Sequence, residues 1–108
     1  MGYQFPQMES NMPRFMCTHT VPPNSITRQQ VDQLTQAAQH DPVVQGYHSY
    51  MNLTEGKAMC IFEAPSKEAM ARWFEKMNLP YDDITQIELE GDKGTISEAG
   101  QRPFVAHA

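Results

Sequence analysis

The order in which two kinds of periodic segment alternate along the chain restricts its fold more than any other feature. Four runs rich in β-branched, aromatic and other apolar residues are typical of strands, and two segments repeat apolar residues at helical spacing. The expected strands are 14–21, 46–53, 57–64 and 83–90, and the expected helices are 27–40 and 66–77. The order strand, helix, strand, strand, helix, strand is the split βαβ arrangement, which predicts an α+β, ferredoxin-like fold.

Local signals mark several ends of these segments. Thr27 and Gln30 have the spacing of a capping box before the first helix. Ser66 is suited to cap the second helix, and Asn78 is suited to end it in a left-handed conformation. Gly56, in the short link between the second and third strands, indicates a hairpin.

This order predicts how the elements are layered. Two right-handed crossovers place both helices on one face of a four-stranded antiparallel sheet, with the first and third strands as central neighbours. The other face receives no element of the core chain, and an uncharged sheet face has to be covered by the tails or by a second copy. We therefore expect a homodimer in which the two open faces meet.

The length bounds the number of domains. A chain of 108 residues is enough for one domain with one hydrophobic core. Residues 1–12 show no period and are expected to be a loose N-terminal arm. Residues 92–108 are broken by glycine and proline and are expected to be a C-terminal tail, which leaves 13–91 as the folded domain.

Composition excludes several classes of partner. The net charge is −5, and only 8 Lys and Arg residues are present, which argues against a nucleic acid. No apolar run approaches the ~18 to 20 residues of a membrane helix.

The first residues lack the pattern of a signal peptide, so the expected location is cytoplasmic. In that compartment Cys17 and Cys60 are not expected to form a disulfide framework.

Three stretches carry a family resemblance: "HTVP" at 19–22, "GKAMCIFEAPS" at 56–66 and "LPYDDITQIELEG" at 79–91. Together they resemble a small bacterial family known as a domain of unknown function, one branch of which is described as nickel-binding. The resemblance covers residues 13–91 and implies a ferredoxin-like dimer.

The chain departs from that family at positions that bear on metal binding. Family members often carry an acid where this chain has Cys17, and an arginine near the position of His48. Many have histidines in the second helix, where this chain has Trp73 and Met77. A metal site built on helix histidines therefore does not transfer, and other residues must supply the ligands.

The first strand carries the most suggestive donors. Strand alternation places Phe15, Cys17 and His19 on one face, and we expect that face to be the open one. His48 from the second strand and Glu63 from the third could join them there. Imidazole, thiolate and carboxylate groups suit nickel or another divalent transition metal. The sequence thus predicts a metal site whose members are His19, Cys17, His48 and Glu63.

Alternation alone does not fix the register of the third strand, so Cys60 could take the place of Glu63 on the ligand face. In a simpler interpretation, His19 and His48 are interface histidines satisfied by hydrogen bonds, and Cys17 is an inert thiol.

Two further functions stay open. The chain could be a small dimeric α+β barrel enzyme of the oxygenase or isomerase type, with a pocket between sheet and helices and His19 as its general base. That pocket would be lined by Phe15, Tyr50, Trp73 and Phe74, although the last two are more simply core residues. The chain could also be an interaction or regulatory module that uses the open sheet face. The sequence does not decide whether the protein is an enzyme, and it names no substrate.

Overall fold

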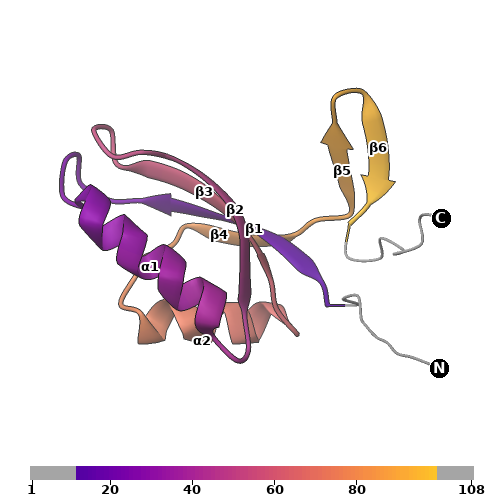
Figure 1. Ribbon diagram of the computed structural model, residues 1–108, viewed down its shortest axis with the longest axis horizontal. Helices are drawn as coiled ribbons and strands as arrows, with labels where there is room; N and C mark the ends of the chain where they lie inside the picture. The colour runs from indigo at the N-terminus through magenta and orange to yellow at the C-terminus, as the bar shows by residue number, and fades with distance from the viewer. Residues whose placement is uncertain (1–11, 100–108) are drawn as a thin grey trace.

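The computed structural model describes residues 12–99 and consists of a four-stranded sheet, two helices and a separate two-stranded hairpin (Figure 1). The strands of the sheet are antiparallel, and their order is β2-β3-β1-β4. In chain order the elements are β1 (Arg14–Thr20), α1 (Arg28–His40), β2 (Gln45–Asn52), β3 (Lys57–Glu63), α2 (Lys67–Lys76), β4 (Asp83–Gln86), β5 (Leu89–Asp92) and β6 (Thr95–Glu98). The predicted α+β class and the pairing of the first strand with the third are confirmed.

Both helices begin with the caps that the sequence indicates. The backbone N–H of Gln30 donates to the Thr27 hydroxyl oxygen at 3.1 Å, and the Gln30 side chain accepts from the Thr27 N–H at 2.8 Å. Ser66 accepts from the N–H of Ala69 at 3.1 Å. Asn78 has a φ of 57°, the left-handed conformation expected where α2 ends.

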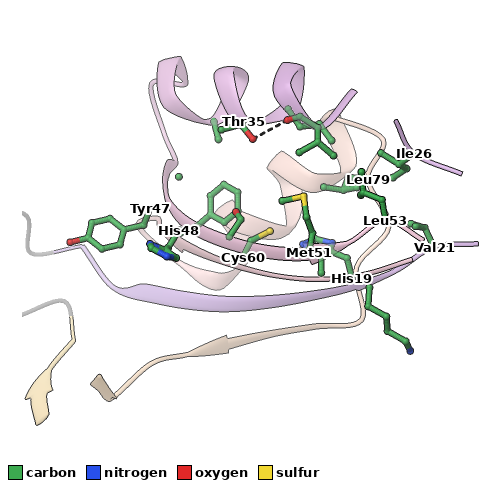
Figure 2. A pocket seen from close by; sticks show the side chains of 18 of the residues that line it. His19, Val21, Ile26, Thr35, Tyr47, His48, Met51, Leu53, Cys60 and Leu79 are labelled. Carbon is green, nitrogen blue, oxygen red and sulfur yellow. Dashed lines mark hydrogen bonds between the residues drawn. The ribbon is translucent and has the colours of Figure 1, made fainter. Parts of the chain in front are cut away.

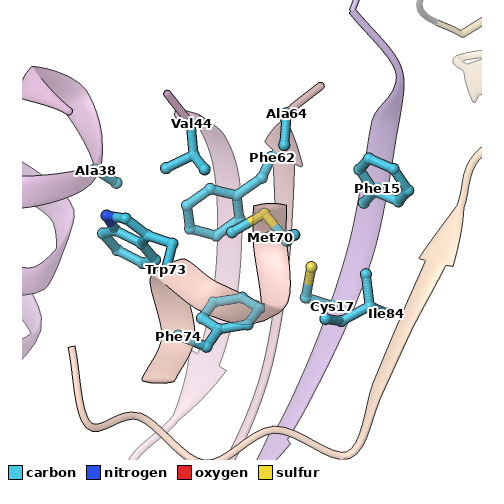
Figure 3. Packing of buried hydrophobic residues seen from close by; sticks show 10 residues of the cluster. All are labelled: Phe15, Cys17, Ala38, Val44, Phe62, Ala64, Met70, Trp73, Phe74 and Ile84. Carbon is cyan, nitrogen blue, oxygen red and sulfur yellow. The ribbon is translucent and has the colours of Figure 1, made fainter. Parts of the chain in front are cut away.

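The hydrophobic core lies between the sheet and the two helices (Figure 3). Its buried members come from β1, β3, β4 and both helices, and include Phe15, Cys17, Phe62, Ile84, Ala38, Met70, Trp73 and Phe74. Because α1 and α2 contribute to one cluster, both helices cover the same face of the sheet. The other face is left without a helix, as the sequence predicts.

The face of β1 that meets this core corrects one expectation. Phe15, Cys17 and His19 are buried under the helices, whereas Met16 on the other face is 39% exposed. Strand alternation defines two faces but does not say which one is covered. Phe15 and Cys17 belong to the same buried cluster as Met70 and Phe74 of α2, and this packing decides which face of β1 is covered.

The open face retains exposed apolar side chains. Met59 is 36% exposed and Tyr50 is 61% exposed. The expectation that a second copy covers this face stays a prediction.

An ion-pair cluster around Arg14 lies at one end of the open face. The guanidinium lies 2.7 Å from a carboxylate oxygen of Glu63 and 2.7 Å from one of Glu90, and it sits 4.1 Å from the centre of the Tyr47 ring. Only 4% of Arg14 is exposed. Glu63 is therefore committed to Arg14, on the side of the sheet opposite His19.

The last predicted strand is shorter than expected and is followed by a hairpin. β4 ends at Gln86, and β5 then pairs with β6 through a turn at Lys93 and Gly94, whose φ angles are 51° and 89°. Two successive positive φ angles are typical of the tight turns that join antiparallel strands. The hairpin stands away from the sheet in Figure 1. Its residues lie on both sides of residue 91, where we expected the folded domain to end.

Residues 1–11 and 100–108 lie outside the described residues, so the expectations of a loose arm and a tail there stay predictions. Neither of the two described helices has both the length and the apolar character that crossing a membrane requires.

Candidate ligand site around His19

A cavity of about 280 Å³ lies between α1 and the sheet (Figure 2). Helix α1 covers it loosely, because Ala38 is the only buried residue of α1, whereas α2 buries four residues. Val31 and Leu34, on the apolar stripe of α1, line the cavity and remain half-buried. The cavity therefore exists because α1 stands off the sheet along most of its length.

The register of the strands explains why the sheet surface under α1, which forms the floor of the cavity, carries short side chains at its middle. Ser49, Cys60 and Cys17 are directly opposite one another across β2, β3 and β1, and Met51, Ala58 and His19 form the next row on the same face. Serine, cysteine and alanine have short side chains, so the middle of the floor carries little bulk. The longer Met51 and His19 flank Ala58 from its two sides.

A close approach between α1 and β2 bounds the cavity at one end. A Cβ atom added to Gly46 would lie 3.0 Å from the Cβ atom of Ala38, so α1 meets the sheet there. At the other end, the Val21 N–H donates to the Gly56 carbonyl at 2.9 Å and ties the end of β1 to the β2–β3 turn.

His19 is the polar side chain with the most distinctive environment in this cavity. It is 5% exposed, and its ring packs edge-on against Phe74 at 4.9 Å between ring centres. Its Nδ1 atom is 2.8 Å from the carbonyl oxygen of Pro80. A carbonyl only accepts hydrogen bonds, so Nδ1 carries the proton and Nε2 keeps its lone pair in the neutral ring. Within residues 12–99 Nε2 is buried and has no hydrogen-bond partner.

An orphaned acceptor of this kind has an energetic cost. A buried polar atom without a partner destabilises the fold by about 1–3 kcal/mol. A donor or a metal ion that reached Nε2 would recover that energy, but the atom is buried, so neighbouring groups would first have to move aside.

Two cysteines lie on the same face as His19. Cys60 lines the cavity and is half-buried; burial raises the pKa of its thiol, and a hydrogen bond with Ser49 lowers it by less. Cys17 is fully buried beside it, and burial, with a smaller effect from Cys60, raises the pKa of Cys17 to about 12. Both thiols therefore stay protonated near neutral pH unless a metal ion displaces the proton.

The structure does not bring the four predicted ligands together. His19 and Cys17 are on the helix-covered face, whereas Glu63 is on the open face with Arg14. His48 is exposed, packs against Tyr50 at 5.0 Å between ring centres, and lies well apart from His19 in Figure 2. In the described part of the chain, no three His, Cys, Asp or Glu side chains are grouped closely enough to hold an ion.

The four residues therefore do not share the open face: packing under the helices buries Cys17 and His19, and the register of β3 leaves Glu63 on the other face. Cys60 pairs with Cys17, which places Cys60 on the face of His19 and Glu63 on the other. The sequence analysis had left this replacement of Glu63 by Cys60 open.

The pocket expected for an enzyme is present in part. Trp73 lines the cavity, and Phe74 packs behind His19. Sequence reasoning missed Met51 and Ala58 as lining residues. The available signal was the placement of Ser49, Ala58 and Cys60, whose side chains are short, on one face of β2 and β3, which leaves space below a helix.

Comparisons with known proteins identify the family of this chain. A model of the family described as nickel responsive protein SCO4226-like matches residues 15–87. The chain belongs to this family. The resemblance inferred from the three sequence stretches, to a small bacterial family with a nickel-related branch, is confirmed.

A solved structure supports the assignment. The crystal structure of SCO4226 from Streptomyces coelicolor A3(2) is 28% identical and superposes with a TM-score of 0.62, covering 72% of this chain and 99% of that chain. No curated protein matches the chain. The family match includes His19 and Cys60 and ends before β5, so the hairpin lies outside the matched residues.

Proposed function

We propose that this member of the nickel-responsive SCO4226-like family binds a divalent transition-metal ion, nickel first, through Nε2 of His19. The observation that carries the proposal is the buried Nε2 atom without a partner, on a ring whose other nitrogen is held by the Pro80 carbonyl. Histidines that ligate metals usually donate their second ring N–H to a carbonyl or carboxylate, which fixes the tautomer. Imidazole nitrogen is a suitable ligand for nickel.

Supporting donors come from the same face. Cys60 lines the cavity and replaces Glu63 in the set predicted from the sequence, and the Met51 thioether is the other sulfur in the lining. Because burial raises the pKa of the Cys60 thiol, ligation by Cys60 requires the metal to displace a proton. Binding should therefore release protons and weaken in acid.

We further propose that the sheet with its two helices is a ferredoxin-like unit and that two copies associate through their open faces. The strand order β2-β3-β1-β4 supports the first part. The exposed Met16, Tyr50 and Met59 support the second, because adjacent apolar side chains on a sheet face favour burial against a partner.

The test compares untagged wild-type protein with His19→Gln and with the control His40→Gln, which lies at the end of α1 outside the cavity lining. Isothermal titration with Ni²⁺, Cu²⁺ and Zn²⁺ is carried out at about pH 7.5 and about pH 5.5, on either side of the usual imidazole titration. We expect His19→Gln to lose about tenfold or more in nickel affinity and His40→Gln to lose nothing. Unchanged binding by His19→Gln, or equal heats at both pH values, would contradict the proposal.

A further inference from the structure

The cavity around His19 has the size of a small organic molecule. Its volume is about 280 Å³. An engineered apolar cavity of about 150 Å³ binds benzene, so by proportion this cavity accommodates roughly 11 non-hydrogen atoms, the size of a two-ring molecule. Its lining includes exposed residues of β2, which is an edge strand of the sheet, among them His48, Ser49 and Met51. A molecule of this size therefore has a way in from that edge.

Apolar side chains form most of the lining. Val31 and Leu34 of α1 lie on one side of the cavity, and Ala58 and Cys60 form part of the sheet floor on the other. Val31 and Leu34 remain half-buried. An apolar molecule between the helix and the floor would complete their burial, which is a main source of affinity in small-molecule sites. The Trp73 ring also lines the cavity, and it favours an aromatic ligand, since stacked or edge-on ring pairs add to the gain from burial.

Most polar side chains of the lining are exposed and keep their contact with water. They are Thr35, Gln39, Tyr47, His48, Ser49 and Lys57. The Thr35 hydroxyl also donates to the Val31 carbonyl at 2.9 Å, and the Gln39 amide donates to the Gly46 carbonyl at 2.7 Å. Within residues 12–99 none of these six has a buried side-chain atom without a partner. A ligand is therefore not required to satisfy them.

His19 differs from these residues, because its Nε2 atom is buried and has no partner among the described residues. Nδ1 carries the proton toward the Pro80 carbonyl, so Nε2 can only accept in the neutral ring. The ligand therefore has to offer a donor. A hydroxyl group offers one, whereas a carboxylate has no proton to donate. An ionised group would also be costly beside Nε2, since the described lining contains no Asp or Glu and its Lys57 side chain is exposed.

A small movement has to open Nε2 to the cavity. Met51 is suited to make it, because Met51 and His19 lie on either side of Ala58 in one row of the sheet and near each other in Figure 2. Met51 is 40% exposed, and an unbranched methionine side chain adopts several conformations at little cost. Its thioether also makes favourable contacts with aromatic rings. Met51 can therefore move aside and then pack against an aromatic ligand.

We propose that the cavity binds a small uncharged aromatic molecule of about two rings that carries a hydroxyl group, and that this hydroxyl donates a hydrogen bond to Nε2 of His19. The inference goes beyond the proposed function, because it assigns an organic ligand to the cavity in the absence of a metal ion. Both ligands would use the Nε2 lone pair, so they exclude each other at His19. Each is therefore tested without the other.

The probe is 2-naphthol, whose hydroxyl group keeps its proton at about pH 7.5, because phenolic groups have a pKa of about 10. Two controls have the same rings: naphthalene lacks the donor, and 2-naphthoate carries a negative charge. Binding to untagged wild-type protein is measured by equilibrium dialysis in sealed cells, with EDTA present so that no metal contributes. We expect 2-naphthol to bind about tenfold or more tightly than either control.

The variant His19→Phe tests the hydrogen bond. It keeps a ring at this position and removes Nε2. We expect the preference for 2-naphthol over naphthalene to fall from about tenfold to about onefold. The control His40→Phe changes an exposed histidine outside the lining and should keep the preference. The ratio of the two affinities is the informative value, because a general loss of packing would weaken both molecules alike.

A second pair of variants links binding to the cavity. Ala58→Leu fills the floor beside His19, and Met59→Leu changes the neighbouring residue on the open face as its control. We expect Ala58→Leu to weaken 2-naphthol binding about tenfold and Met59→Leu to leave it unchanged. A measurement on wild-type protein needs no variant: nuclear Overhauser effects should connect the protons of bound 2-naphthol with the methyl groups of Val31 and Leu34.

Several results would overturn the inference: no saturable binding of 2-naphthol, equal binding of either control, a preference that survives in His19→Phe, or Overhauser effects only to residues outside the lining. None of these results depends on nickel, so the inference and the proposed function can fail separately. If 2-naphthol does not bind but His19→Gln loses nickel affinity, the inference fails and the proposed function stands. If 2-naphthol binds as expected but His19→Gln keeps its nickel affinity, only the proposed function fails.

Discussion

The Nδ1 atom of His19 lies 2.8 Å from the carbonyl oxygen of Pro80, and this contact determines which ring nitrogen keeps a lone pair. Pro80 belongs to the segment between α2 and β4. That segment is held against β1 by the N–H of Asp82, which donates to the Thr18 carbonyl at 2.7 Å, and by the Thr20 hydroxyl, which donates to the Asp82 carboxylate at 2.7 Å. The position of the imidazole is therefore fixed before any ligand arrives.

The first prediction concerns the tautomer of His19. In the neutral ring we expect the proton on Nδ1, because the Pro80 carbonyl can only accept a hydrogen bond. The nitrogen chemical shifts and long-range proton–nitrogen couplings of the ring distinguish the two tautomers. A proton on Nε2 near neutral pH would remove the lone pair on which the proposed function depends.

The second prediction concerns thiol reactivity. Cys60 is half-buried and lines the cavity, whereas Cys17 is fully buried in the core with its pKa raised to about 12. A maleimide should therefore modify Cys60 first, and Cys17 should react only at the rate of unfolding. The Cys60→Ser variant serves as the control, since its remaining thiol should be unreactive in the folded protein. Modification of Cys17 at the faster rate would contradict the packing described for β1.

The sequence was sufficient to predict the two helices and the first three strands, because their signals are local. It did not predict that β4 ends at Gln86 or that β5 and β6 form a hairpin. The capping box of Thr27 with Gln30 and the left-handed Asn78 depend on neighbouring residues only, and both were predicted correctly. The covered face of β1 was not predictable in the same way. Alternation gives Cys17 and His19 a common side, but only the packing of α2 decides that this side is inside.

The candidate site depended on contacts between distant strands. The exchange of Glu63 for Cys60 follows from the β1–β3 register, which pairs Cys17 with Cys60. One residue of shift would have moved Glu63 to the face that carries His19, although still at the Arg14 end of β1. The orphaned Nε2 atom also depends on Pro80, 61 positions along the chain, and no spacing rule predicts that contact.

The third prediction concerns the ion pairs of Arg14. Glu63 meets the guanidinium with both groups nearly buried, whereas the Glu90 side chain is 24% exposed. Glu63→Gln removes the more buried of the two carboxylates that face Arg14 and leaves the charge compensated by Glu90 alone, so it should destabilise the fold by about 3 kcal/mol. Glu90→Gln should cost only about 1 kcal/mol, because solvent screens that pair. Urea unfolding of both variants measures the difference, and equal losses would contradict the ranking.

The fourth prediction concerns Asp41, which joins the end of α1 to α2. One carboxylate oxygen accepts the N–H groups of Val43 and Val44 at 2.8 and 3.0 Å, and the other accepts the Trp73 ring N–H at 3.1 Å and lies 3.5 Å from the Lys76 ammonium. Asparagine has one oxygen and cannot accept on both sides. Asp41→Asn should therefore cost about 1–3 kcal/mol near neutral pH, measured by urea unfolding.

This loss should depend on pH in a defined direction. Burial raises the pKa of Asp41, but the two backbone N–H donors and Lys76 together lower it below its usual value. A lowered carboxyl pKa contributes stability that is present above the unfolded-state value of about 3.9 and is lost as the pH falls through the folded value. The difference between wild type and Asp41→Asn should shrink in acid, and a constant difference would show that the carboxylate charge contributes nothing.

The last prediction uses two glycines with similar backbone conformations. Gly56 has a φ of 77° and Gly94 a φ of 89°, so alanine at either position pays the left-handed penalty of roughly 1–2 kcal/mol. At Gly56 an added Cβ would also lie 2.0 Å from the Val21 carbonyl oxygen, whereas at Gly94 nothing lies within 4 Å. Gly56→Ala should therefore be less stable than Gly94→Ala by about 2 kcal/mol or more in urea unfolding. Equal stability of the two variants would mean that β1 and the β2–β3 turn are not in the close contact that bounds the site.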